Sequence, residues 1–366
     1  MFHIARMNDH PVRPSHRTPG RGALTNPAVR FDRVVGEAVD DGWVSNDDLP
    51  VLRTQVTEER PRRVITRNTS PDLNFDRSIN PYRGCEHGCI YCFARPSHAY
   101  LGLSPGLDFE TKLIARPGSP QLLAEELRSK TYVPKTIAIG TNTDPYQPIE
   151  SQRGIMREIL KVLAAFRHPV GIVTKGTLIE RDIDILKDMA AEGLVRVGLS
   201  VTTLDNATSR AMEPRVPAPA ARLRTIERLS KAGITVRVMC SPVVPALTDH
   251  EMEAILSAAR DAGAVAASAI VLRLPREVAG LFEDWVRETF PDRAERVLGR
   301  VRELHGGKLY DPEFGKRMTG QGKWAEIMRQ RFKLAVRRLD LKETLPPLRT
   351  DLFAPPPRAG DQLSLF

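Results

Sequence analysis

Short apolar runs alternate with amphipathic runs along the middle of the chain, from about residue 76 to residue 275. The short runs predict buried strands near 78–82 and at 135–140, 170–174, 195–201, 235–240 and 267–272. Strands that alternate with helices form parallel βαβ units. The pattern therefore predicts an α/β fold with about six parallel strands, each followed by a helical run.

The longer runs between these strands carry apolar residues at helical spacing. They predict helices at 151–167, 178–191, 220–232 and 249–262. Gly193 lies two residues after the second of these runs and Gly233 directly after the third, as is typical of helix ends. Thr248 and Glu251 form a capping box at the start of the fourth.

The segments on both sides of this unit lack the alternation. Residues 1–30 are rich in Pro, Arg, His and Gly, which predicts a disordered basic arm. Residues 31–75 form a polar N-terminal extension, and residues 276–342 are predicted to be a helical, basic C-terminal region. Residues 343–366 form a proline-rich tail that we expect to stay extended. The α/β unit itself is expected to span residues 76–275.

The composition is that of an ordinary globular protein, with 41% hydrophobic and 27% charged residues among 366. No apolar run approaches the ~20 residues of a membrane span, and the N-terminus lacks the apolar core of a signal peptide. Four cysteines, three of them in one loop, do not form a disulfide framework, so we expect a reducing, cytoplasmic location. A net charge of +9 favours polyanionic partners.

The chemistry of the chain is concentrated in the loop after the first predicted strand. Cys85, Cys89 and Cys92 lie there in the spacing Cys-x3-Cys-x2-Cys. Gly84 and Gly88 allow the backbone to turn tightly enough for the three sulfurs to face one centre. Three thiolates are one fewer than a closed zinc site needs, but they suit a [4Fe–4S] cluster with one open iron.

A structural zinc knuckle is the alternative interpretation of this loop. It requires a fourth ligand, for which His87 or His98 is available. Structural zinc sites usually combine two pairs of ligands, each of the Cys-x2-Cys type, and no second cysteine pair follows here. The spacing favours the cluster.

With Tyr91 directly before the last cysteine, the motif resembles the signature of the radical S-adenosylmethionine (SAM) superfamily. The resemblance implies a partial (β/α)6 barrel and a [4Fe–4S] cluster on Cys85, Cys89 and Cys92, whose open iron binds SAM. In that superfamily, one electron from the reduced cluster splits SAM into methionine and a 5′-deoxyadenosyl radical, which takes a hydrogen atom from the substrate. It also implies an electron donor such as flavodoxin or ferredoxin.

Polar residues at the other strand ends are the candidates for SAM binding, because barrels of this kind carry their chemistry there. The segment Thr-Asp-Pro-Tyr-Gln-Pro at 143–148 replaces the Gly-rich motif usual after the second strand. It resembles the branch of the superfamily that includes spore photoproduct lyase. The residues predicted to contact the cofactor are Tyr91, Thr141, Asn142, Thr143, Asp144, Lys175, Ser200 and Arg215.

The substrate is less directly indicated. The branch resemblance and the basic balance predict DNA, in a repair-type lyase or base-modifying reaction; RNA, a protein and a small metabolite are the alternatives. In spore photoproduct lyase a cysteine returns a hydrogen atom to the product radical, and Cys240, at the end of the fifth predicted strand, is the candidate here. No motif around Cys240 is shared with that enzyme, and a buried free cysteine usually behaves as a small hydrophobe.

The last five residues, Gln362, Leu363, Ser364, Leu365 and Phe366, resemble the peptide by which bacterial DNA repair and replication proteins bind the polymerase sliding clamp. A flexible tether ending in leucine and phenylalanine anchors suits a docking peptide. One alternative is a tail folded back on the domain. Another, for the whole chain, is a non-catalytic zinc-bearing adaptor of the clamp.

Overall fold

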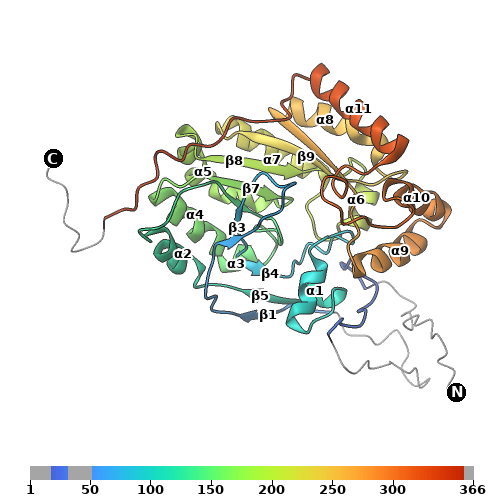
Figure 1. Cartoon of the computed structure of the whole chain (residues 1–366), viewed down its shortest axis with the longest axis horizontal. Coiled ribbons are helices and arrows are strands. Elements are labelled where there is room, and N and C mark those ends of the chain that lie inside the picture. Colours follow the sequence, from blue (N-terminus) through green and yellow to red (C-terminus); the bar gives the residue numbers. More distant parts are fainter. Residues whose placement is uncertain (1–17, 32–51, 358–366) are drawn as a thin grey trace.

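The computed structural model describes residues 18–31 and 52–357 (Figure 1). Its central sheet contains, in spatial order, β10 (Ala266–Val271), β9 (Val236–Val243), β8 (Val195–Ser200), β7 (Val170–Thr174), β6 (Ile137–Ile139), β3 (Arg77–Ile79) and β2 (Thr66–Arg67). Strands β3 and β6 to β10 are parallel and neighbour one another in chain order, whereas β2 is antiparallel at one edge. This arrangement confirms the predicted partial (β/α)6 barrel.

A second, smaller sheet lies beside the first strand of the barrel. It consists of β1 (Gln55–Glu58), β5 (Lys112–Ala115) and β4 (Tyr82–Arg83), in that order. The strand predicted near 78–82 is therefore two short strands that belong to different sheets. Pro81 lies between them and has no N–H to donate to a ladder, which explains the break.

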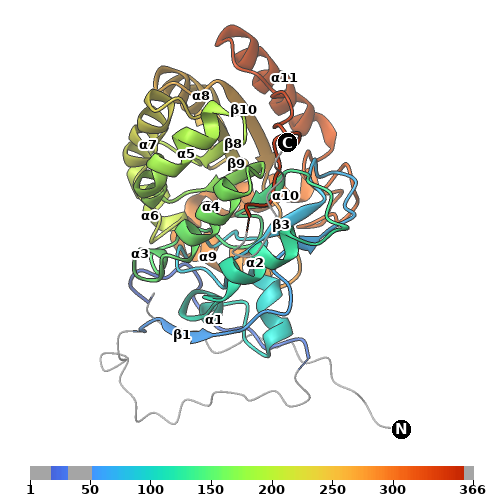
Figure 2. The same ribbon diagram turned by 90° about the vertical axis from the view of Figure 1, so that its left-hand side faces the viewer.

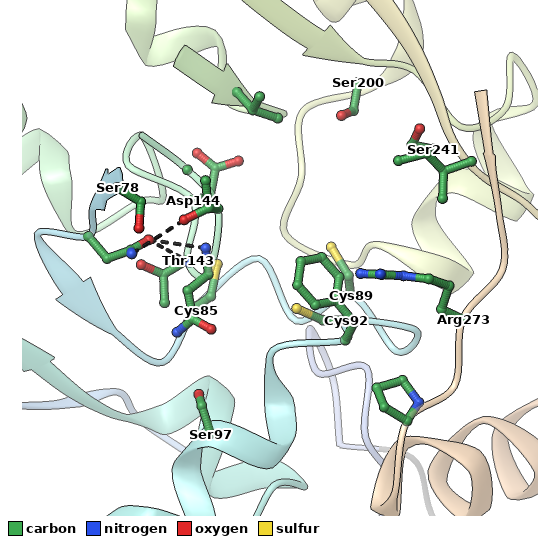
Figure 3. Close-up of a pocket in the computed structure, with 18 of the residues that line it drawn as sticks. Ser78, Cys85, Cys89, Cys92, Ser97, Thr143, Asp144, Ser200, Ser241 and Arg273 are labelled. Carbon is green, nitrogen blue, oxygen red and sulfur yellow. Dashed lines mark hydrogen bonds between the residues drawn. The ribbon is translucent and has the colours of Figure 1, made fainter. Parts of the chain in front are cut away.

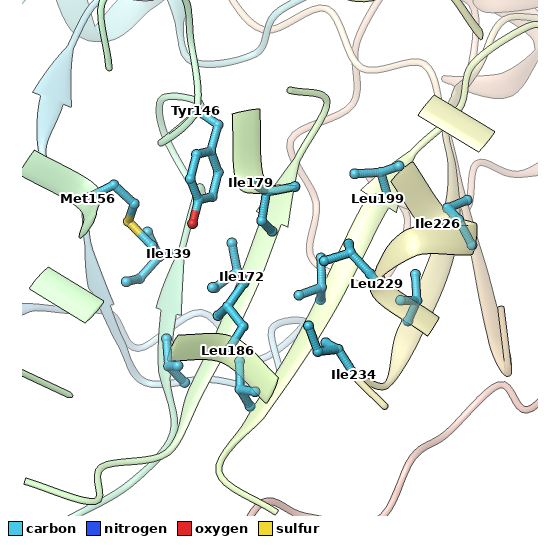
Figure 4. Packing of buried hydrophobic residues seen from close by; sticks show 14 of the residues in the cluster. Ile139, Tyr146, Met156, Ile172, Ile179, Leu186, Leu199, Ile226, Leu229 and Ile234 are labelled. Atoms are coloured by element: carbon cyan, nitrogen blue, oxygen red, sulfur yellow. The ribbon is translucent and has the colours of Figure 1, made fainter. Parts of the chain in front are cut away.

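Helices cover the outer face of the sheet. They are α2 (Ser119–Leu127), α4 (Ile155–Ala165), α5 (Ile183–Ala191), α7 (Pro219–Lys231) and α8 (Met252–Asp261). The short helices α3 (Glu150–Arg153) and α6 (Asn206–Met212) lie in the connections that follow β6 and β8, and α6 contacts the cysteine loop, where the N–H of Ile90 donates to the carbonyl of Met212 at 3.1 Å. The predicted helix 151–167 is interrupted at Gly154, which has a φ of +63°. Figure 4 shows how Ile172, Leu199 and Leu229 pack in the core between strands and helices, where all three are fully buried.

The C-terminal region is helical, with α9 (Glu277–Thr289), α10 (Pro291–Leu304) and α11 (Gly322–Arg338). Trp285 of α9 is fully buried and belongs to a hydrophobic cluster that also contains Ile90 and Tyr91 of the cysteine loop. The helical region therefore supports the loop that carries the predicted chemistry. In the described part of the chain, no helix is long and apolar enough to cross a membrane.

Residues 18–31 pack against the back of the cysteine loop, next to α1 (Leu107–Thr111). The carboxylate of Glu110 accepts hydrogen bonds from the backbone N–H groups of Gly22 and Ala23, both at 2.9 Å. The buried Arg21 donates to the carbonyl of Glu110 at 3.0 Å. The prediction of a disordered arm is therefore wrong for residues 18–30. Polar contacts hold this segment in place, and such contacts produce no apolar periodicity in the sequence. Residues 1–17 and 32–51 lie outside the described residues.

The beginning of the proline-rich tail crosses the end of the barrel that faces away from the cysteine loop. The N–H of Arg349 donates to the carbonyl of Gly193 at 3.1 Å, and that of Ala354 donates to the carbonyl of Phe166 at 3.1 Å. Gly193 and Phe166 precede strands β8 and β7, so this is the end where the parallel strands begin. The described part of the tail, residues 343–357, has no helix or strand and is attached to the domain through Arg349 and Ala354.

Candidate active site

A cavity of about 910 Å³ lies at the carboxyl ends of the parallel strands (Figure 3). Its lining includes Asn80, Gly140, Lys175, Ser200 and Arg273, which follow or end β3, β6, β7, β8 and β10. Parallel strands bring their carboxyl ends to one edge, which is why residues so far apart in sequence meet here. The three cysteines of the loop line the same cavity.

The cysteine loop is held in a tight conformation by its glycines. Gly84 and Gly88 have φ angles of +75° and +66°, a region that side chains disfavour. A Cβ atom on Gly84 would lie 2.7 Å from the Leu113 side chain and 2.9 Å from the carbonyl oxygen of Phe109. That carbonyl also accepts the N–H of Cys85 at 2.9 Å. The loop therefore follows the edge of α1 too closely to tolerate larger residues.

The three thiols are unpaired cysteines that face the cavity from two sides. Cys85 and Cys89 are buried and Cys92 is partly exposed. Figure 3 shows Cys89 and Cys92 together on one side of the cavity, with Cys85 on the other, near Thr143 and Asp144.

The chemistry of these thiols fits an iron–sulfur cluster. Burial raises the pKa of the thiols of Cys85, Cys89 and Cys92, and the nearby Asp144 carboxylate raises that of Cys85 further. Thiolates in such a site need the compensating positive charge of bound iron. No three His, Cys, Asp or Glu side chains within residues 18–31 and 52–357 are grouped as a single metal ion would require. In a [4Fe–4S] cluster each cysteine binds a different iron, so separated sulfurs are expected.

The two histidines considered as zinc ligands have other partners. His98 donates from Nε2 to the carbonyl of Lys112 at 2.9 Å, and its ring packs edge-on against Phe109. His87 lines the cavity, and its Nδ1 lies 3.4 Å from Oδ2 of Asp144. His98 therefore packs behind the cysteine loop and supports it, and is not free to bind zinc.

Asp144 organises the loop that follows β6. Its carboxylate accepts hydrogen bonds from Oγ1 of Thr174 (2.6 Å) and from the backbone N–H groups of Lys175 (2.7 Å) and Tyr146 (2.9 Å). Burial alone would raise the pKa of Asp144, but His87 and these hydrogen bonds outweigh it and hold the pKa below its usual value. The carboxylate therefore remains charged while it ties the ends of β6 and β7 together.

A second buried carboxylate, Glu213, lies behind the cavity and contacts two of its lining residues, Tyr91 and Lys175. It forms an ion pair with Arg222 (Oε2 to Nη2, 2.9 Å) and accepts a hydrogen bond from the hydroxyl of Tyr91. Lys175 lies 3.9 Å from Glu213, and its ammonium is 5.7 Å from the centre of the Tyr91 ring. Burial raises the pKa of Tyr91 well above its usual value, so its hydroxyl stays protonated and serves as a donor.

Most of the residues predicted to contact SAM are brought together by the fold. Those that line the cavity with the three cysteines are Tyr91, Thr141, Asn142, Thr143, Asp144, Lys175 and Ser200. The backbone N–H of Asn142 donates to Oδ1 of Asn80 at 3.0 Å, which fixes the loop after β6 against the end of β3. Their assignment to the cofactor remains a prediction.

Two predicted residues are not part of the cavity wall. Arg215 pairs with Glu86 (3.1 Å) on the outer side of the cysteine loop, so its guanidinium is engaged by a carboxylate of the protein itself. Cys240 lies in the main hydrophobic core, whereas its neighbours Met239 and Ser241 line the cavity. Side chains alternate between the two faces of a strand, so Cys240 points away from the cavity. The predicted roles of Arg215 as a cofactor contact and Cys240 as a hydrogen donor are therefore corrected.

Sequence reasoning missed several residues of the cavity and its support. Arg222 of α7 is fully buried and pairs with Glu213. The sequence of this helix does not indicate that one of its arginines has a buried carboxylate partner. Arg273 and Phe93 both line the cavity, and the guanidinium carbon of Arg273 lies 4.5 Å from the centre of the Phe93 ring. Burial lowers the pKa of Arg273. The position of Phe93 directly after Cys92 was the one available signal for this pair.

Comparison with known proteins identifies the family. The model of the radical SAM superfamily matches residues 79–259. An uncharacterized protein of Mycobacterium tuberculosis is 38% identical over 242 residues, which are 66% of this chain and 70% of that protein. An uncharacterized protein of Methanocaldococcus jannaschii is 28% identical over 174 residues, 47% of this chain and 62% of that protein.

Solved structures of spore photoproduct lyase have a similar fold. One variant of that enzyme aligns with a TM-score of 0.56 and 12% identity over 78% of this chain and 79% of that chain. Another, with bound AdoMet and dinucleoside spore photoproduct, aligns with a TM-score of 0.55 and 11% identity. At this identity the likeness concerns the fold.

The chain belongs to the radical SAM superfamily. It is a radical SAM enzyme whose cofactors are a [4Fe–4S] cluster and SAM, with Cys85, Cys89 and Cys92 as the residues that fit the cluster. When bound, the reduced cluster supplies the electron that cleaves SAM. The residues of this chain hold the cluster loop in place, keep Asp144 charged at the wall and Glu213 charged behind it, and enclose the reacting groups.

Proposed function

We propose that this radical SAM enzyme acts on DNA, in a repair-type or base-modifying reaction. The observation that carries the proposal is the charge of the cavity wall. Of the described residues that line it, Asp144 is the one carboxylate, whereas the cationic side chains are Arg83, Arg116, Lys175, Arg273 and Arg317. Carboxylates outside the wall pair with several of these cations: Glu59 with Arg83 and Arg116, and Asp72 with Arg317. Among the described residues, Arg273 is the lining cation with no carboxylate within 4.0 Å. Positive charge in a concave site attracts polyanions.

Aromatic side chains at the same cavity suit a nucleobase. Phe93 and Tyr100 both line it, although 46% of Phe93 and 69% of Tyr100 are exposed. Exposed aromatic rings beside basic groups form the stacking surfaces of many proteins that bind single bases, each contact contributing roughly 1–3 kcal/mol. An enzyme that acts on a base must bring that base out of the helix and into a pocket. The fold shared with spore photoproduct lyase, whose solved structure contains a dinucleoside photoproduct, supports the same substrate class.

The direct test is turnover with defined nucleic acids. The reconstituted protein is incubated without oxygen with SAM, a reductant and either ultraviolet-irradiated DNA, undamaged DNA or RNA. We expect irradiated DNA to accelerate the release of 5′-deoxyadenosine and to lose lesions, as measured by liquid chromatography and mass spectrometry of the digested DNA. Stimulation by RNA alone, or SAM cleavage that none of the nucleic acids alters, contradicts the proposal and points to the RNA, protein or metabolite alternatives.

We also propose that the C-terminal peptide Gln362–Phe366 binds the bacterial sliding clamp. These residues lie outside the described residues. The proposal is supported by the attachment of the tail at Ala354, whose N–H is bonded to Phe166 at the end of the barrel away from the cavity. A partner bound beyond that point leaves the cavity accessible to DNA.

The clamp proposal is tested with purified sliding clamp and two forms of the protein. The intact chain is expected to bind, and a version that ends at Asp361 is expected not to bind. Equal binding of the two forms, or no binding of either, contradicts it. Metal analysis of the same preparations separates the enzyme from a zinc-bearing adaptor, because the enzyme contains iron and sulfide.

A further inference from the structure

Arg273 is a lining residue of the cavity to which no role has been assigned so far. It follows the last parallel strand, β10, and its side chain extends toward Cys89 and Cys92 (Figure 3). The guanidinium lies over the ring of Phe93, 4.5 Å from its centre. Arg273 thus lies across the cavity from the loop after β6, which contains four of the residues predicted to contact SAM, Thr141 to Asp144.

The other buried or partly buried arginines around the cavity have carboxylate partners. Arg95 pairs with Glu110 at 2.5 Å and Arg222 pairs with Glu213 at 2.9 Å. Arg83 and Arg116 both pair with Glu59, at 3.2 and 3.4 Å. Arg317 pairs with Asp72 at 2.6 Å through two of its nitrogen atoms. These pairs satisfy the positive charge of each guanidinium within the protein.

Arg273 has no such partner. Within residues 18–31 and 52–357, no carboxylate lies within 4.0 Å of its nitrogen atoms, and its one hydrogen bond goes to the thioether sulfur of Met318 at 3.4 Å. Sulfur is a weak acceptor, and a partly buried charge without a strong partner is costly. The planar guanidinium offers several N–H donors in a geometry that matches a phosphate group.

We propose that Arg273 binds a backbone phosphate of the nucleic-acid substrate. The inference rests on the proposed function, because it assumes that the substrate is DNA. The phosphate would lie in the half of the cavity formed by β10 and the segment that contains Tyr310 and Arg317. The ion pair between Arg317 and Asp72 is already neutral, so the unpaired charge of Arg273 is the one that a phosphate neutralises. The aromatic ring of Phe93 beneath it is then available to the neighbouring base.

The test measures binding of a fluorescent DNA duplex to the reconstituted protein as a function of salt. Each phosphate neutralised by a cation contributes about −0.9 to the slope of log K against log salt concentration. Arg273→Gln is expected to make the slope shallower by about 0.9 and to weaken binding about tenfold at moderate salt. Arg273→Lys keeps the charge and the slope but loses the two-pronged contact, so its affinity is expected to be intermediate.

Arg296→Gln is the matched control, because Arg296 is an exposed arginine of α10 that does not line the cavity. It is expected to leave the slope unchanged. Thermal melts establish that all variants are folded, and Arg273→Lys provides the comparison if Arg273→Gln is unstable.

The outcomes separate this inference from the proposed function. If the wild type binds DNA and Arg273→Gln has the same slope, or if Arg296→Gln changes the slope equally, the inference is wrong and the function stands. A weaker affinity of Arg273→Gln for SAM without DNA also overturns it, since the guanidinium then serves the carboxylate of the cofactor. A wild type that binds no DNA overturns both.

Discussion

The two ends of the barrel differ in how their polar groups are satisfied. At the cavity end, the carboxylates Asp144 and Glu213 are surrounded by donors of the protein, while Arg273 lacks a strong partner. At the opposite end, the tail of the chain covers the barrel: Phe353 packs against His168, with ring centres 5.5 Å apart. Polar atoms left for a ligand are thus found at the end where the parallel strands finish, and the other end contributes stability.

The fold therefore separates the residues that support the site from the site itself. The back of the cysteine loop is a saturated network in which Arg95 donates to the carbonyl of Cys89 and pairs with Glu110. The front of the loop presents the thiols and Phe93 to the cavity. Changes at the front should therefore alter chemistry, and changes at the back or at the far end should alter stability.

The largest effect is expected at the front of the loop. Substitution of Cys85, Cys89 or Cys92 by alanine should reduce SAM cleavage to background, because the cluster then lacks one of its ligands. The release of 5′-deoxyadenosine and the iron content of the reconstituted protein measure this. Cys240→Ala is the matched control: its thiol lies in the core, so the variant should keep both iron and SAM cleavage. Full activity in any of the first three variants would sink the assignment.

The next effect concerns the back of the loop. Glu110→Gln leaves the fully buried Arg95 without its carboxylate, and breaking a buried ion pair in this way costs about 3–5 kcal/mol. Denaturant unfolding of the protein without cofactors gives the change in the free energy of unfolding.

Glu125→Gln serves as the control for this substitution, because Glu125 is exposed on α2. Its effect should stay within about 0.5 kcal/mol. Equal effects of the two substitutions would show that the ion pair of Glu110 and Arg95 does not stabilise the cysteine loop.

The sequence predicts the features that depend on local pattern. The alternation of strands and helices gives the partial barrel, and the spacing of Cys85, Cys89 and Cys92 gives the cluster loop. The strand ends then predict Asp144 and Lys175 at the cavity, since parallel strands finish at one edge. These predictions needed no knowledge of long-range contacts.

The remaining features depend on contacts between distant segments. Arg21 belongs to a segment without apolar periodicity, yet it binds Glu110, 89 residues away. The orientation of Cys240 depends on which face of β9 meets the helices, and a one-residue shift in the predicted strand reverses it. Arg273 stands out only because, in the described part of the chain, no carboxylate lies within 4.0 Å of its nitrogen atoms, and a sequence contains no list of neighbours.

At the far end, the buried His168 makes the stability of the protein depend on pH. Burial, to which the nearby Arg77 adds, lowers the pKa of His168 from 6.5 to about 4; its Nε2 accepts the hydroxyl of Tyr132 at 2.7 Å. Between these two pH values the unfolded state binds the proton and the folded state does not. The stabilising contribution is therefore complete above pH 6.5 and is lost as the pH falls to about 4.

His168→Gln removes this titration. The free energy of unfolding of the wild type should fall by about 3 kcal/mol more than that of the variant between pH 7 and pH 4. Denaturant unfolding at several pH values measures the difference. Identical pH profiles would mean that His168 has the same pKa in the folded and the unfolded protein and that this end is not closed against water.

The smallest effect is expected from the tail itself. Phe353 is partly buried and its ring lies 5.5 Å from that of Tyr132, so Phe353→Ala should lower the free energy of unfolding by about 1–3 kcal/mol. Leu334→Ala, at an exposed position of α11, is the control and should have almost no effect. Because the tail crosses the end of the barrel away from the cavity, Phe353→Ala should leave SAM cleavage unchanged while the tail becomes more susceptible to proteolysis. A parallel loss of SAM cleavage in this variant would show that the two ends of the barrel are coupled, and the separation of support from chemistry would then fail.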